Sequence, residues 1–100
     1  MGVQASPVIL AIAEAADRIC PQFGKDPRLC VQQAFAISRN GQAAARWNCW
    51  NLPAGLGDAP DVVLTVARRA PPPQYARLEK RGISTFSGPD AAVLAWCRRA

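Results

Sequence analysis

The spacing of apolar residues near the start of the chain predicts an amphipathic helix. From Ser6 to Ile19, apolar side chains including Val8 and Ile12 recur at helical spacing on one face, and the charged residues lie off that face. Ser6 followed by Pro7 is a typical helix start, because the serine side chain can cap free backbone N–H groups and proline fits the first turn. We therefore expect the first helix over 6–19.

A second helix is predicted by the same start signal at Asp26 and Pro27. It should close near Asn40 and Gly41, which tolerate left-handed backbone. The segment 42–47 could add a short helical turn. The residues expected to face inward from the second helix are Val31, Ala34, Phe35 and Ile37.

The second half of the chain has a different pattern. Residues 48–60 are rich in Gly, Pro and Asn and predict an ordered loop. The β-branched run 61–69 predicts a strand, and 75–87 its antiparallel partner, with three prolines in the connection. Pro89 should start a last helix. The chain is thus expected to form a single domain over 1–100, α+β and mostly helical, with a minor β-hairpin lobe.

The amino-acid composition excludes several kinds of catalytic and metal site. The chain has twelve Lys and Arg, seven Asp and Glu, no His and a net charge of +5. Without histidine there is no His general base, no His-activated nucleophile and no His-bound metal. The run 7–13 is too short to span a membrane and no basic segment precedes it, so we predict neither a membrane span nor a signal peptide.

The four cysteines, Cys20, Cys30, Cys49 and Cys97, are widely spaced and form no Cys-x-x-Cys motif. Structural zinc sites usually bring their ligands in close pairs, so we expect no metal and no cofactor. Buried free thiols and one or two disulfides both remain open. Cys20 and Cys30 flank a short loop and are the first pair to test.

The order of short motifs resembles the lysozyme superfamily, in particular bacterial and phage glucosaminidases and lytic transglycosylases. Segment 23–29 (FGKDPRL) resembles their entry into the helix that carries the catalytic Glu. Segment 48–55 (NCWNLPAG) resembles their N-N-L-F-G-I-K segment. Segment 85–96 (TFSGPDAAVLAW) resembles the motif that leads into their later helix. The resemblance implies a lysozyme-like fold and peptidoglycan as substrate or partner.

The residues that depart from this family pattern are those expected to be catalytic. Ile37 occupies the position that matches the catalytic Glu, and Ala67 the position that often holds a second carboxylate. Glycoside hydrolysis normally needs an acid to protonate the leaving oxygen. The resemblance therefore implies a domain that has lost its chemistry, unless the acids have been relocated.

Two carboxylates are candidates for a relocated acid: Glu14 in the first helix and Glu79 in the hairpin. A solvated helix surface explains Glu14 equally well, and ion pairing with neighbouring basic residues explains Glu79. The candidates for saccharide contact, from the family's cleft positions or by stacking, are Trp47, Trp50, Asn51 and Tyr75. Packing of the loop onto the core is the alternative use of the tryptophans.

Three functions follow from these observations. The sequence favours a structural or wall-contacting module without catalysis, whose partners would be peptidoglycan or other phage structural proteins. The virion, its tail in particular, is a setting that the resemblance implies; assembly into an oligomer there is compatible with the sequence. An active peptidoglycan glycosidase with relocated acids is the second hypothesis. The third is a basic adaptor for an acidic protein or for nucleic acid, although no nucleic-acid motif accompanies the charge.

Overall fold

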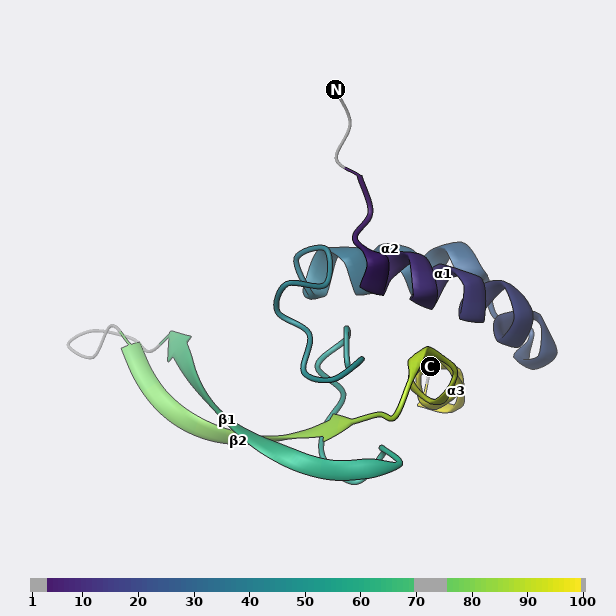
Figure 1. Ribbon diagram of the computed structural model, residues 1–100. Helices are drawn as coiled ribbons and strands as arrows, with labels where there is room; N and C mark the ends of the chain where they lie inside the picture. The colour runs from purple at the N-terminus through teal and green to yellow at the C-terminus, as the bar shows by residue number, and fades with distance from the viewer. Residues whose placement is uncertain (1–3, 70–75, 100) are drawn as a thin grey trace.

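The computed structural model describes residues 4–69 and 76–99, which form three α-helices, one 3₁₀ turn and a two-stranded antiparallel sheet. Figure 1 shows α1 and α2 side by side and α3 seen along its axis, while the two strands extend away as a curved ribbon. The predicted α+β organisation, mostly helical with a minor hairpin, is confirmed. The elements are α1 (Pro7–Ile19), η1 (Cys20–Phe23), α2 (Pro27–Ile37), β1 (Ala59–Arg69), β2 (Ala76–Thr85) and α3 (Pro89–Arg99).

The first two helices begin where the capping residues predicted. The Ser6 hydroxyl accepts a hydrogen bond from the Ile9 N–H at 3.3 Å. The Asp26 carboxylate accepts one from the Arg28 N–H at 2.9 Å. Each cap satisfies a backbone donor that the first helical turn leaves free, which fixes the start of the helix.

The end of α2 is tied to the start of α1 by buried and half-buried polar groups. Buried Ser38 donates from its hydroxyl to the Ala34 carbonyl at 2.5 Å and accepts from the Gly41 N–H at 2.8 Å. The Asn40 side chain accepts from the Ser6 N–H at 2.8 Å. These bonds hold the two helices in a fixed relation at this end.

The core lies where the three helices meet the loop before β1. Helix α1 packs against both α2 and α3. The aromatic part of the core consists of Trp50 from the loop, Trp96 from α3 and Phe86 after β2. Burying each large side chain contributes roughly 1.5–3 kcal/mol. The other apolar residues of this core cluster are Ile9, Ile12, Ala15, Ala16, Cys20, Cys30, Ala34, Cys49, Leu52, Ala92, Val93 and Cys97.

The loop before β1 is anchored to β2. The Ser84 N–H donates to the Leu52 carbonyl and the Ala54 N–H donates to the Gly82 carbonyl, both at 3.1 Å. Buried Asn48 fixes the same loop: its amide group donates to the carbonyls of Leu52 and Ser84 at 2.9 and 2.8 Å, and its oxygen accepts from the Leu52 N–H at 2.9 Å. The side chain of Asn48 therefore holds the predicted loop in an ordered conformation.

Two local expectations were wrong. Ile37 lies on the same face of α2 as buried Ala34 but is 43% exposed, because it is the last helical residue and borders a cavity. The segment 42–47 forms turns without a helix, since Arg46 and Trp47 have φ values of 42° and 72°, which a right-handed helix does not allow. Among the described residues, no helix is both long enough and apolar enough to cross a membrane.

Candidate functional site: two cavities that share Arg99

A cavity of about 330 Å³ opens where α2, the loop and α3 meet, and we call it the tryptophan cavity. One face along the length of α2 provides one wall, and the end of α3 provides another. Its lining is mostly apolar, with one amide and one guanidinium as polar groups. The lining residues are Leu29, Gln33, Ile37, Trp50, Leu52, Trp96 and Arg99.

The two indoles of this cavity are held in place by their ring N–H groups. Trp50 donates to the Cys30 carbonyl at 3.1 Å, and Trp96 donates to the Gln33 side-chain oxygen at 3.1 Å. The ring centroids are 6.4 Å apart with planes tilted by 33°. Trp50 is 7% exposed and Trp96 4% exposed, so each contributes a small part of its surface to the cavity. The pair forms a rigid apolar base beneath more exposed residues.

The rim of the tryptophan cavity on the side of α2 is apolar. Ile37 and Leu29, which are 43% and 46% exposed, line it from α2. Within residues 4–69 and 76–99, no Asp or Glu side chain is part of this lining. The cavity can therefore contact an apolar or hydroxylated surface, but its side chains provide no proton donor of the kind that glycoside hydrolysis uses.

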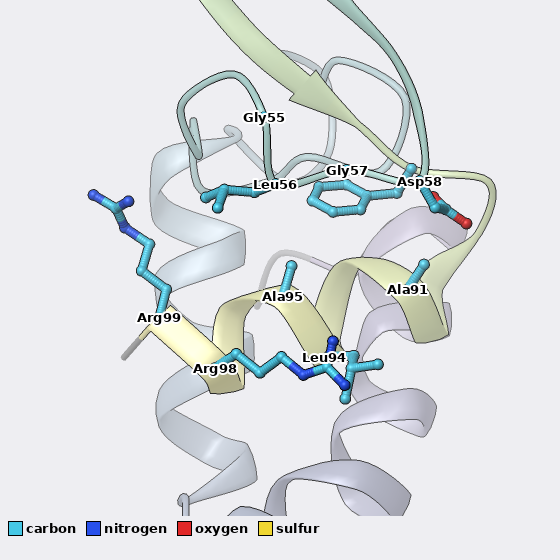
Figure 2. A pocket seen from close by; sticks show the side chains of 10 residues that line it. Gly55, Leu56, Gly57, Asp58, Ala91, Leu94, Ala95, Arg98 and Arg99 are labelled. Atoms are coloured by element: carbon cyan, nitrogen blue, oxygen red, sulfur yellow. The ribbon is translucent and has the colours of Figure 1, made fainter.

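A second cavity of about 640 Å³ lies between α3 and the loop 55–58, and we call it the loop cavity. Figure 2 shows Leu56 on the loop side, across from Ala91 and Ala95 of α3. Arg99 lines both cavities, so the two share a cationic boundary. The lining residues are Gly55, Leu56, Gly57, Asp58, Phe86, Ala91, Leu94, Ala95, Arg98 and Arg99.

Asp58 is the carboxylate that lines the loop cavity, and its surroundings keep it ionised. The Ser87 hydroxyl donates to it at 2.5 Å and the Ser87 N–H at 2.9 Å. These hydrogen bonds lower the pKa of Asp58 below its usual range, because they favour the charged form. A carboxyl with a lowered pKa is a poor general acid at neutral pH, since it has no proton to give.

The two glutamates proposed as relocated acids lie away from both cavities. Glu14 is exposed on α1, and Glu79 is half-buried on β2. Neither is part of the lining of the tryptophan cavity or of the loop cavity. The structure thus brings neither of them to Ile37, the position at the end of α2 where the resemblance placed the missing acid.

Of the residues proposed for saccharide contact, three lie in the described part of the chain, and they do not share one cavity lining. Trp50 lines the tryptophan cavity. Trp47 is half-buried and packs against the core, and Asn51 is exposed with a φ of 54°. Tyr75 lies outside the described residues.

Sequence reasoning did not find the other polar groups of the site. Gln33 is not among the residues expected to face inward from α2, and the sequence predicts no role for Arg98 or Arg99 at the end of α3. The signal that could have pointed to Arg99 is its spacing, three residues after Trp96, which places both on one face of α3. Within the described part of the chain, no three His, Cys, Asp or Glu side chains are grouped so that they could hold a metal ion.

The fold has a counterpart among solved structures. It is similar to the catalytic domain of the autolysin Auto from Listeria monocytogenes, with a TM-score of 0.75 and 12% sequence identity. The superposition covers 98% of this chain and 59% of that chain, so this chain spans little more than half of the Auto domain. No protein-family model matches the sequence, and no curated protein matches it. The small α+β fold with a hairpin lobe, predicted as lysozyme-like, is thus similar to part of an autolysin catalytic domain.

Proposed function

We propose that this domain binds the glycan strands of peptidoglycan through the tryptophan cavity and does not cleave them. The observation that carries the proposal is the exposed Ile37 at the end of α2, beside an aromatic cavity whose lining has no Asp or Glu side chain among the described residues. The similarity to an autolysin catalytic domain supports peptidoglycan as the ligand.

The chemistry of the cavity suits a sugar. Apolar and aromatic surfaces contact the C–H faces of pyranose rings, and a few fixed polar groups orient the ligand. Gln33 uses its side-chain oxygen to hold Trp96, which leaves the amide N–H groups as donors. Arg99 adds a guanidinium at the edge that leads to the loop cavity. Hydroxyl, acetamido and lactyl oxygens are natural acceptors for these groups.

The same residues argue against hydrolysis. Retaining and inverting glycosidases normally use a pair of carboxyl groups, one of which must be protonated. The lining of the tryptophan cavity includes Ile37 and, among the described residues, no Asp or Glu, and Asp58 in the loop cavity is kept ionised by Ser87. A domain with this arrangement can retain a glycan surface while lacking the proton transfer.

The first test combines binding and turnover on purified cell-wall sacculi. The protein should sediment with the sacculi and release no soluble fragments. Release of fragments that Glu14→Gln or Glu79→Gln abolishes would establish an active hydrolase and refute the proposal.

The second test places the binding surface. Ile37→Gln removes apolar contact at the tryptophan cavity, and Leu10→Gln is its matched control at an exposed position of α1 outside both linings. Loss of about 40 Å² of apolar contact at about 25 cal/mol per Å² corresponds to about 1 kcal/mol, or about a fivefold weaker Kd. Equal affinity of the two variants would exclude the tryptophan cavity as the glycan site.

A further inference from the structure

The four cysteines, scattered along the sequence, are all buried and free. Cys20 begins η1 and is 0% exposed, while Cys97 lies near the end of α3 and is 3% exposed. Their sulfur atoms are 3.5 Å apart although the residues are 77 positions apart in the sequence. Packing of α3 against α1 and η1 produces this contact.

We propose that Cys20 and Cys97 form a disulfide bond when the chain folds in the presence of a disulfide oxidant. A disulfide has an S–S length of about 2.05 Å. Closing the remaining gap requires a shift of about 1.5 Å, which side-chain rotation and a small movement of α3 can share.

Cys30 is the competing partner, because it also contacts Cys20. Burial raises the pKa of the Cys30 thiol, and the neighbouring Cys20 raises it further. The pair Cys20 and Cys30 was the first choice from sequence, since both flank a short loop. The Cys97 thiol donates a hydrogen bond to the Cys20 sulfur at 3.5 Å, and Cys49 is hydrogen-bonded with the Ser38 hydroxyl instead. Geometry therefore favours the pairing across the domain.

The reaction is a thiol–disulfide exchange with an oxidant such as glutathione disulfide or a thiol oxidoreductase. The thiolate of one cysteine attacks the oxidant, forming a mixed disulfide and releasing one thiol. The thiolate of the second cysteine attacks the protein sulfur of that mixed disulfide, which forms the Cys20–Cys97 bond and releases a second thiol. The two thiol protons pass to the two leaving groups, and two electrons reduce the oxidant.

The environment of the thiols determines when this reaction occurs. Burial, and secondarily the hydrogen bond with Cys20, raises the pKa of Cys97 to about 12. Thiolate is the attacking species, so exchange is slow in the closed domain. The bond should form while α3 is docking, and burial should then protect it from reductants.

The bond would fix the helix that serves both cavities. Helix α3 contributes Trp96 to the tryptophan cavity and Arg99 to both cavities. A covalent link between α3 and η1 restricts the movement of that helix without adding any group to the cavities. This inference does not depend on glycan binding, and its test does not use a glycan.

The test maps the cross-link in the full chain. The denatured protein is refolded with reduced and oxidised glutathione, free thiols are blocked, and the product is digested with trypsin without reduction. Each cysteine falls in its own tryptic peptide: 19–25, 29–39, 47–68 and 82–98. We expect peptide 19–25 linked to peptide 82–98. A link between 19–25 and 29–39, or four blocked thiols, would overturn the proposal.

Thermal unfolding provides the second readout. The oxidised protein should melt about 10 °C or more above the reduced protein, because the bond closes a long loop. Cys97→Ala should abolish this difference, and Cys49→Ala, the matched control, should preserve it. A difference that persists in Cys97→Ala would refute the pairing. The wild-type peptide map decides the pairing even if Cys97→Ala does not fold.

Discussion

The side chain of Asn48 should be the most important polar group for stability in the loop that shapes the tryptophan cavity. It is 1% exposed and makes three hydrogen bonds, two to Leu52 and one to Ser84. Replacing it with alanine leaves one buried N–H and two buried carbonyls without these partners. At about 1–1.5 kcal/mol for each lost bond, Asn48→Ala should lower the free energy of unfolding by about 3–4 kcal/mol.

Such a loss is large for a domain of 100 residues, whose total stability is of the order of 5–15 kcal/mol. It corresponds to a fall in Tm of about 15 °C or more. Urea unfolding followed by tryptophan fluorescence measures it, with Gln32→Ala on the exposed face of α2 as the control. A change below about 1 kcal/mol in Asn48→Ala would show that the loop is held by packing alone.

Three further predictions concern neighbouring positions. Asn48→Asp would bury a carboxyl whose pKa should rise, so the loss in free energy of unfolding relative to the wild type should shrink as the pH falls. A loss that is the same at pH 7 and at pH 4 would contradict this. A Cβ at Gly57 would lie 2.0 Å from the backbone oxygen of Thr85, so Gly57→Ala should lose at least ~2 kcal/mol in urea unfolding; Gly88→Ala, with nothing within 4 Å, should lose less than ~0.5 kcal/mol. Because hydrogen bonds hold the pKa of Asp58 below its ordinary 3.8, the stability that it contributes at neutral pH should be lost as the pH falls below 3.8. Asp58→Asn should therefore have a lower Tm than the wild type at pH 7 and the same Tm at pH 2.

The helices and the hairpin could be predicted because their signals are local. Ser6 and Asp26 cap helices through atoms within three residues, and the β-branched run of β1 needs no distant partner to be identified. The stop at Ile37 could also be anticipated within a few residues, because Asn40 and Gly41 adopt the positive φ values that they favour.

The site could not be predicted in the same way, because its residues are assembled by tertiary packing. The periodicity of α2 predicts an inward-facing Ile37, which is instead 43% exposed, because a helical pattern does not show where the elements that cover the helix end. Likewise, the sequence pattern of Gln33 is that of a surface residue, but its side-chain oxygen accepts a hydrogen bond from the Trp96 ring N–H once α3 docks. The contact between Cys20 and Cys97 depends on the same docking event.

That docking has a consequence for synthesis of the chain. Helix α3 is synthesised after the other described elements, yet it supplies Val93, Trp96 and Cys97 to a core whose other side is α1. While a ribosome is still producing the hairpin, the apolar face of α1 with Ile9 and Ile12 has no α3 to cover it. The domain should therefore complete its folding after α3 has left the exit tunnel, and until then it offers an exposed apolar segment to chaperones or to aggregation.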